Sequence, residues 1–395
     1  MKAFTEPLLS LAGFEEMTKT AEKSSGLISV TGCIDAQKSQ MIYAFGGHRK
    51  NKLIVTFGEQ KAKELYDEYS FFDKEVVYYP SKDVLFYQSD IRGNLLTAER
   101  IRALKAIREQ ERVTLVTTFD ALMNTMAPIE KMWENVLTLE QGQLLDLKEI
   151  QAALIRMGYE KEYQVQTMGQ FSVRGGILDV FPLTEENPIR IELWGDEIDT
   201  IRYFDCESQK SIENTDRVSI YPAAELVLSD EEKAGGIDKL KAEAKRVSDK
   251  LRKQMKTEEA HRVTVMADEL TEEWGELSMY AGMDAFLSYF FDERVGLLDY
   301  FNPSDSLIFF DELTRCAEQG KLTETEFSES MKQRLAMGYI LPGQMNGLFT
   351  EKEIVAKLEK YSCIALGALD NKANGLHQLG SYGIHCQSVS PYNNS

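Results

Sequence analysis

The chain has 395 residues, which is enough for two or three domains that each bury a core of their own. Its net charge of −19 argues against extensive nonspecific binding of nucleic acid, because phosphate neutralisation needs clustered Lys and Arg. The five cysteines form no CxxC pair and no apolar run is long enough to span a membrane, so we expect a cytoplasmic protein without membrane contact, disulfide framework or zinc site.

Residues 25–126 alternate short apolar runs with helix-like segments. The expected strands are Leu27–Thr31, Leu53–Phe57, Val76–Tyr79 and Val113–Thr117. The expected helices cover 38–45, 59–69, 97–111 and 119–126, and Thr97 is the predicted N-cap of the third helix. Alternation of strands and helices predicts a parallel sheet flanked by helices.

The first expected strand is followed by a sequence that is close to a phosphate-binding P-loop. Gly32, Lys38 and Ser39 stand at the spacing of the motif G-x-x-x-x-G-K-[S/T], but Gln37 occupies the second glycine position. A glutamine side chain crowds the space in which the loop amides should face a phosphate. Asp35 adds a negative charge that would repel the phosphate. These departures indicate an eroded nucleotide site.

A later apolar run, Leu307–Phe310, ends at Asp311 and Glu312, where a nucleotide-binding fold places the acidic residue on its metal side. The alternative for these two carboxylates is a helix N-terminus, where the helix dipole favours negative charge. Spacing alone leaves a working ATP site, an eroded site and a coincidence open, and it favours the eroded site. We find no catalytic residue and no metal cluster.

Residues 136–222 are predicted to be mostly short strands, with one helix near 148–157. In Ile189–Trp194, side chains alternate between two faces, so the aliphatic residues face a core while Arg190, Glu192 and Trp194 face outward. Gly195 and Asp196 then provide a two-residue hairpin turn. Arg and Trp on one outward face are typical of a docking surface.

The preceding segment places a second arginine beside this row. Phe171 and Val173 are expected to be buried while Arg174 points outward, and Gly175-Gly176 allows a bulge or bend. Two structural alternatives remain for the outward row of Arg190, Glu192 and Trp194. The tryptophan could pack against a neighbouring domain, and the arginine could form a surface ion pair with the glutamate.

After Tyr221-Pro222, the sequence predicts a capping box that begins at Ser229, and a long charged helix that follows Gly235-Gly236. A narrow apolar seam runs along this helix and comprises Ile237, Leu240, Ala244, Val247, Leu251 and Met255. Residues 258–300 are expected to be mostly helical, and Cys363–Leu366 is a further buried-strand candidate.

Several motifs of the chain resemble the N-terminal part of bacterial transcription-repair coupling factors (Mfd). They are FSVRGGILDVFP, the following PIRIELWGDEIDTIRYFD, and the later IYPAAE, LLDYF and SVSPYNNS. The first two are similar to a segment that Mfd shares with the excision-repair helicase UvrB. The resemblance covers nearly all 395 residues.

The resemblance implies an α/β fold in which a degenerate RecA-like parallel-sheet domain is interrupted by a smaller α+β domain rich in antiparallel strands. The implied units are 1–134 (domain 1a), 135–222 (domain 2, which binds UvrA), 223–385 (domain 1b, with the long charged helix) and 386–395 (the start of a linker or further domain). The chain would then be the first part of a longer protein.

The implied function is that of a non-catalytic adaptor that recruits UvrA to stalled RNA polymerase in transcription-coupled nucleotide excision repair. The UvrA-contacting arginines of the family fall on Arg174 and Arg190, and its aromatic contact falls on Trp194, beside Glu192. No cofactor is implied for this segment. ATP and Mg would serve the ATP-dependent DNA translocase of the full-length protein, whose missing C-terminal domains would also contact RNA polymerase and DNA.

Two departures from the relatives qualify this resemblance. Many relatives have phenylalanine at the position of Trp194. UvrB probes damaged DNA with a long aromatic-rich hairpin, whereas Ser81–Leu96 is short and holds only Phe86 and Tyr87. The alternative function is a UvrB-like ATPase or damaged-DNA-binding repair helicase fragment, and a third is a scaffold that restrains a motor within the full protein.

Overall fold

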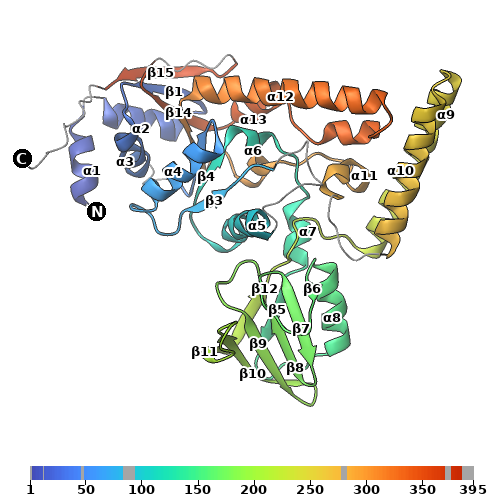
Figure 1. Cartoon of the computed structure of the whole chain (residues 1–395). Helices are drawn as coiled ribbons and strands as arrows, with labels where there is room; N and C mark the ends of the chain where they lie inside the picture. Colours follow the sequence, from blue (N-terminus) through green and yellow to red (C-terminus); the bar gives the residue numbers. More distant parts are fainter. Residues whose placement is uncertain are drawn as a thin grey trace, which may run out of the picture.

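The computed structural model describes residues 2–11, 13–45, 49–82, 94–276, 283–369 and 375–384. The body of the molecule is built from two stretches of the chain (Figure 1). The first stretch contains α1 (Lys2–Leu9), α2 (Phe14–Lys23), β1 (Gly26–Thr31), α3 (Asp35–Phe45), β2 (Asn51–Thr56), α4 (Glu59–Tyr69), β3 (Val77–Tyr79), α5 (Asn94–Glu109), β4 (Val113–Thr118), α6 (Phe119–Met123) and α7 (Ile129–Glu134). The second contains α9 (Asp230–Lys253), α10 (Thr257–Glu276), η1 (Met283–Phe286), α11 (Leu287–Phe290), η2 (Leu297–Tyr300), β13 (Ser306–Asp311), α12 (Leu313–Ala336), η3 (Pro342–Asn346), α13 (Glu351–Leu358), β14 (Ser362–Gly367) and β15 (Gln378–Gly383).

The two stretches share one seven-stranded sheet in the order β15-β1-β14-β13-β2-β4-β3. Every neighbouring pair in this sheet is parallel. The N-terminal strand β1 lies between the two C-terminal strands β14 and β15, and β13 lies between β14 and β2. The α/β fold with a parallel sheet that the sequence predicts is therefore confirmed.

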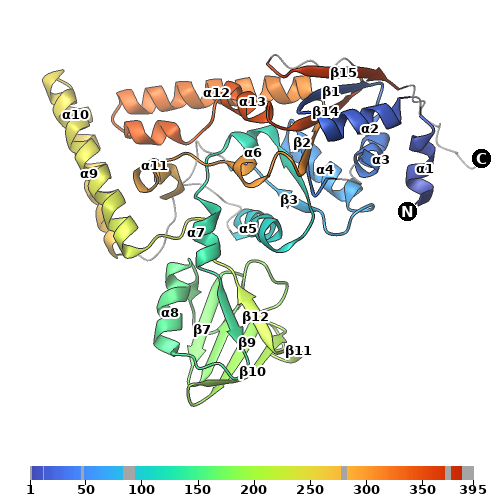
Figure 2. The same ribbon diagram turned by 180° about the vertical axis from the view of Figure 1, so that it is seen from behind.

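Helices cover both faces of this sheet because its strands are apolar on both sides. Leu53 and Val55 of β2 belong to one core, which also contains residues of α5, α6, α12 and α13. Ile54, between them, belongs to the other core, with residues of α1, α2, α3 and α4. The result is a three-layer arrangement of helices, sheet and helices (Figures 1 and 2).

The strand-rich segment between the two stretches forms a separate lobe, here called the inserted domain (residues 137–220). Figure 1 shows it below the body, joined to it near α7. Its elements are β5 (Leu137–Glu140), α8 (Leu147–Arg156), β6 (Glu160–Lys161), β7 (Gln170–Arg174), β8 (Ile177–Val180), β9 (Ile189–Trp194), β10 (Glu197–Phe204), β11 (Ser211–Thr215) and β12 (Arg217–Ile220). A six-stranded sheet has the order β11-β10-β9-β8-β7-β6, and β12 pairs with β5.

The pairs from β7 to β11 are antiparallel, and only the short pair β6–β7 is parallel. This agrees with the predicted α+β insertion. Gly175-Gly176 forms a two-residue turn between β7 and β8, with Gly175 at φ +60°, so the predicted bulge or bend is in fact a hairpin turn. Gly195-Asp196 forms the predicted turn between β9 and β10. The residue boundaries at 134 and 222 stay a prediction.

The helical part after the insertion forms a hairpin of α9 and α10, which lies at the opposite end of the body from α1 (Figures 1 and 2). The predicted capping box at Ser229 is present, with Glu232 as its partner. The helix begins at Asp230 and runs through Gly235-Gly236, so the predicted start after the glycines is wrong. Gly236 faces Phe290 of α11, where no larger side chain fits. Met255, predicted in the seam, lies beyond the helix and is exposed.

Other boundaries differ from the prediction by a few residues. Helix α5 begins at Asn94, so Thr97 lies inside its first turn and is not the N-cap. Helix α3 begins at Asp35 rather than at residue 38. Most of Ser81–Leu96, including Phe86 and Tyr87, lies outside the described residues, as does 386–395. None of the helices in the described part of the chain combines the length and apolarity needed to cross a bilayer.

Candidate partner-binding face and the remnant of a nucleotide site

One face of the six-stranded sheet packs on α8, and the other face carries a row of polar side chains across neighbouring strands. Ser172 of β7 lies opposite Asp179 of β8, Asp179 lies opposite Arg190 of β9, and Arg190 lies opposite Arg202 of β10. Residues directly opposite on one face of an antiparallel pair have Cβ atoms about 5 Å apart. The strand registers therefore bring together polar residues that are up to 30 positions apart in the sequence.

Asp179 is the centre of this row and binds two arginines. Its Oδ1 accepts a hydrogen bond from Arg190 Nε at 2.7 Å, and its Oδ2 accepts one from an Arg190 terminal nitrogen at 2.8 Å. The same Oδ2 accepts a hydrogen bond from Arg174 at 2.8 Å. The Asp179 side chain is only 2% exposed, compared with 12% for Arg190 and 35% for Arg174. Both predicted docking arginines thus share one buried carboxylate.

Arg190 is fixed by two further contacts. Its guanidinium lies 4.3 Å from the ring centre of Phe204, a cation–π distance. It also donates a hydrogen bond to Gln209 Oε1 at 2.8 Å. Gln209 has φ +60°, an unusual conformation for a residue with a side chain. The hydrogen bonds with Asp179 raise the pKa of Arg190, so this residue keeps its charge.

Glu192 belongs to a separate ion pair, because it accepts a hydrogen bond from Arg202 at 3.1 Å. Thr200 donates a further hydrogen bond to Glu192 at 3.2 Å. The alternative in which Arg190 pairs with Glu192 is therefore wrong, since Asp179 takes Arg190. The sequence pattern overlooked Asp179 because it considered β9 alone, without its neighbour β8.

Trp194, at the end of β9, is 84% exposed. Within the described residues it packs against no other domain, so the packing alternative stays untested. Beside Trp194 is an open hollow of about 740 Å³, whose lining includes Glu140, Glu197, Asp199 and Asp216. The candidate face therefore combines a basic end at Arg174 and Arg190, a bare aromatic side chain and an acidic hollow.

Four residues of this face were not predicted from the sequence: Asp179, Arg202, Phe204 and Gln209. Asp179 had a signal, because it is an acidic residue between Leu178 and Val180 in an otherwise apolar strand. The sequence also contained a signal for Arg202, because this residue lies in the motif PIRIELWGDEIDTIRYFD together with Arg190. Gln209 lies in a loop, and no spacing rule points to it.

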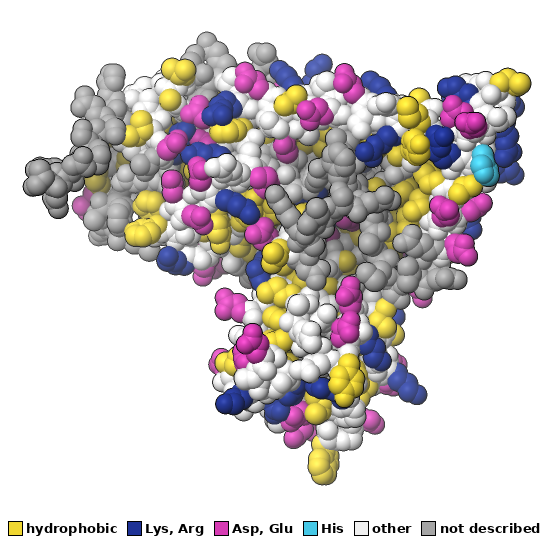
Figure 3. All heavy atoms as spheres, viewed as in Figure 1, with side chains coloured by type: hydrophobic (Ala, Val, Ile, Leu, Met, Phe, Trp, Pro, Cys, Tyr) yellow, Lys and Arg dark blue, Asp and Glu magenta, His cyan; other side chains and the backbone are white. Residues whose placement is uncertain are grey.

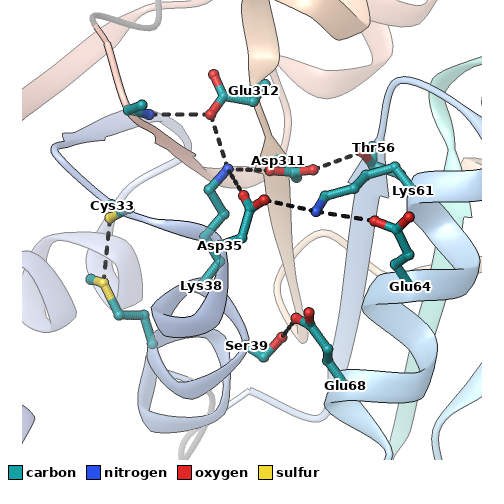
Figure 4. A network of polar contacts seen from close by, with 12 residues as sticks. Cys33, Asp35, Lys38, Ser39, Thr56, Lys61, Glu64, Glu68, Asp311 and Glu312 are labelled. Carbon is teal, nitrogen blue, oxygen red and sulfur yellow. Dashed lines mark hydrogen bonds and ion pairs between the residues drawn. The ribbon is translucent and has the colours of Figure 1, made fainter. Parts of the chain in front are cut away.

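Three of the predicted nucleotide-site residues, Lys38, Asp311 and Glu312, come together at the end of β13 (Figure 4). Lys38 Nζ lies 2.5 Å from Asp311, 2.9 Å from Glu312 and 3.2 Å from Asp35. The Lys38 side chain is 2% exposed. Burial opposes its charged form, but the attraction of Asp311 and Glu312 outweighs burial and raises the pKa of Lys38. Thr56 binds the second oxygen of Asp311 at 2.8 Å.

The backbone of the P-loop-like segment is also engaged. In a P-loop, successive backbone N–H groups cradle phosphates. Here the N–H of Gly32 donates to the carbonyl of Ala368 at 3.3 Å, and that of Cys33 donates to the carbonyl of Gly367 at 3.1 Å. A side chain at Gly32 would collide with the carbonyl oxygen of Ile384. Backbone carbonyls at the end of β14 thus accept hydrogen bonds from two amides of this segment.

Ser39 and Asp35 also have partners within the protein. Ser39 Oγ donates to Glu68 at 3.3 Å, and Asp35 accepts from Lys61 at 3.1 Å. Gln37 Oε1 is buried and has no hydrogen-bond partner among the described residues. Asp311 and Glu312 do lie at a helix N-terminus, as the alternative predicted, because Glu312 is the N-cap residue of α12, although its side chain makes no capping hydrogen bond.

Chemically, this cluster is a closed ion network whose carboxylates outnumber its lysines, a setting that repels a polyphosphate. The described residues include no group of three or more His, Cys, Asp and Glu side chains that could hold a metal ion.

Comparison with known proteins agrees with this geometry. Residues 137–226 match the family model of the UvrB interaction domain. The matched segment contains the whole candidate face. The resemblance seen in the sequence is confirmed. The chain is 29% identical to the transcription-repair-coupling factor of Bacillus subtilis (strain 168) over 309 residues. The match covers 78% of this chain and 26% of that protein.

Two other relatives carry the same name. The transcription-repair-coupling factor of Staphylococcus epidermidis (strain ATCC 35984) is 28% identical over 85% of this chain and 28% of its own length. That of Staphylococcus aureus (strain Mu50) is 34% identical over 55% of this chain and 19% of its own length. The chain thus spans about a quarter of the length of the curated relatives it matches.

Proposed function

We propose that this chain is an adaptor module of a transcription-repair-coupling protein and that it binds UvrA through the outer face of the inserted domain. Arg174, Arg190 and Trp194 are the main contacts, with Glu192 beside them. The observation that carries the proposal is the arginine pair fixed on Asp179 next to a bare tryptophan, in the segment that matches the UvrB interaction domain. Arg and Trp in such a setting are typical binding hot spots.

The role of the module follows from its relatives' name. An adaptor that holds UvrA would bring the excision machinery to RNA polymerase stalled on damaged DNA. In this proposal the contacts to RNA polymerase and DNA, and the translocase that uses ATP and Mg, belong to parts of a longer protein. Basic and acidic side chains are mixed on the face seen in Figure 3, and no broad basic surface stands out among the described residues there.

We also propose that the Lys38 cluster is structural and that this segment takes no cofactor. The support is the ion pairs that engage Lys38 and the carbonyls that engage the loop amides. ATP hydrolysis by the purified chain that disappears in Lys38→Ala would contradict this part of the proposal and would favour the UvrB-like ATPase.

The UvrA-binding proposal is tested with a charge reversal at the most fixed contact. Arg190→Glu should reduce UvrA binding by at least 100-fold, because it places a carboxylate against Asp179 and removes the central cation. The measurement is the affinity of the chain for immobilised UvrA, with circular dichroism to verify the fold.

The matched control is Arg156→Glu, the same change on exposed α8 on the other side of the sheet. It should leave the affinity within twofold of the unaltered chain. Equal losses in both variants, or none in Arg190→Glu, would exclude this face as the UvrA site.

A further inference from the structure

We propose that Asp179 is the positioning residue of the docking face and that the arginine pair it holds receives a carboxylate from the partner protein. This inference rests on the proposed function, and it names the chemistry of the group that the partner contributes. It starts from a feature that β9 alone does not reveal, namely that one carboxylate serves both arginines.

The geometry explains how one side chain can set the position of two. Both oxygens of Asp179 are used, and its side chain is almost fully buried, so the carboxylate cannot turn toward solvent. Arg190 binds it through two nitrogens in a forked arrangement, which fixes the plane of the guanidinium. The Phe204 ring contacts the face of the Arg190 guanidinium, and Gln209 accepts a hydrogen bond from it. The arginines are thus ordered before a partner arrives, which lowers the entropic cost of binding.

The charge balance indicates what the partner supplies. Arg174, Arg190 and Asp179 carry two positive charges and one negative charge, so the group has one uncompensated cation. Arg174 uses one terminal nitrogen on Asp179, and its other donors have no partner among the described residues. It is also the more exposed of the two arginines. A free guanidinium edge of this kind fits a carboxylate with two parallel hydrogen bonds.

A phosphate would also fit a guanidinium, but the surroundings disfavour a nucleic acid. Glu192, paired with Arg202, lies on the same face as Arg174, and the hollow beside Trp194 is lined by four more carboxylates and one arginine, Arg217, so its charge is negative. These acidic groups would repel the successive phosphates of a nucleic-acid backbone. A single Asp or Glu side chain on a protein surface can contact Arg174 without approaching them. The partner group is therefore a carboxylate of a protein, adjacent to an apolar patch that covers Trp194.

The role of Asp179 is tested with Asp179→Asn, which keeps the size of the side chain and removes its charge. The amide can hold at most part of the arginine contacts, so UvrA affinity should fall by about tenfold or more per folded molecule. The local charge rises from +1 to +2, so the residual binding should depend more steeply on salt concentration. A merely structural role would change the folded fraction and leave the salt dependence as it is.

The matched control is Ser172→Ala, in the same row and equally buried. Ser172 Oγ donates a hydrogen bond to the carbonyl of Tyr163 at 2.7 Å and carries no charge. Its loss should lower thermal stability and leave both the affinity per folded molecule and the salt dependence unchanged. If Asp179→Asn behaves like Ser172→Ala in binding, the positioning role is wrong. If the unaltered chain does not bind UvrA, the proposed function fails as well, so the two failures are distinguishable.

The partner's carboxylate is identified by charge exchange. Arg174→Glu should lose UvrA binding, and one Asp→Arg or Glu→Arg variant on the UvrA surface should restore it by at least tenfold. A full scan of acidic UvrA surface residues without restoration would overturn the carboxylate. Binding of a 30-base-pair DNA duplex that is lost in Arg174→Glu would overturn it in favour of phosphate.

Discussion

At the residue scale, Lys38 shows what a spacing rule can and cannot predict. The structure brings Lys38 to Asp311, because strand ends in a parallel sheet meet at one edge. The motif could not predict the contacts of Lys38 with Asp311 and Glu312, since those depend on where β13 lies in the sheet.

These contacts predict a large contribution of Lys38 to stability. Lys38→Met leaves Asp311 buried without its main counter-charge, and removing one partner of a buried ion pair costs about 3–5 kcal/mol. Urea unfolding at pH 7 measures the change. Lys19→Met is the matched control, because Lys19 pairs with Glu15 on the surface and its loss should leave the urea midpoint almost unchanged. Similar losses for both variants would show that the cluster is not structural.

At the scale of elements, side-chain periodicity predicted the faces of strands well, whereas the ends of helices were predicted less accurately. The alternation in β9 predicted the outward row correctly, because one face of that sheet is buried against α8 and alternation is then enforced. The start of α9 was wrong because two glycines are ordinarily poor helix residues. Position 236 lies inside the helix and faces Phe290, which is more than 50 residues away in the sequence. Only glycine fits there, because the Phe290 ring leaves no room for a side chain. Local sequence does not contain that information.

The neighbouring glycines provide a matched pair for this explanation. A Cβ at Gly236 would lie 2.2 Å from the Phe290 ring, whereas a Cβ at Gly235 would meet nothing within 4 Å. Gly236→Ala should therefore destabilise the chain by about 1–3 kcal/mol through overpacking. Gly235→Ala should stabilise it by up to about 1 kcal/mol through helix propensity. Thermal unfolding of the two variants should show shifts of opposite sign, and shifts of the same sign would contradict the packing argument.

At the scale of the whole molecule, a buried ionic cluster joins the body to the chain that leaves the inserted domain. Arg100 of α5 is fully buried and binds Glu225 at 2.7 and 3.0 Å. Lys82 binds Glu225 at 2.9 Å and Asp284 at 2.6 Å. Glu225 ends the motif IYPAAE, which the sequence analysis used only as a point of resemblance. Its physical role could not be predicted because its partners come from three distant segments.

This cluster predicts a defined pH dependence. Burial opposes ionisation of Glu225, but attraction to Arg100 and Lys82 outweighs it and lowers its pKa to about 2. A lowered pKa contributes stability above the ordinary glutamate value, near 4.5, and this contribution is lost as pH falls toward 2. Glu225→Gln should thus be about 3 kcal/mol less stable than the unaltered chain at pH 7, with the difference shrinking between pH 4.5 and 2. Urea unfolding across this range measures it, and a constant difference would contradict the assignment.

Predictability of the overall architecture was also uneven. A parallel sheet with an antiparallel insertion could be predicted, because strand–helix alternation and hairpin turns are local patterns. The order β15-β1-β14-β13-β2-β4-β3 could not, because pairs such as Leu27 with Cys363 join distant parts of the sequence.

That strand order has a consequence during synthesis of the protein. Strand β1 finds its neighbours β14 and β15 only after more than 300 further residues have been made, which takes about 15–70 seconds at usual rates of translation. The inserted domain pairs its strands within one continuous stretch, so it can close while the body is still incomplete. On a translating ribosome, the arginine face would therefore form before the seven-stranded sheet of the body is complete. Until then, the strands of the first stretch would keep unpaired backbone groups at their edges.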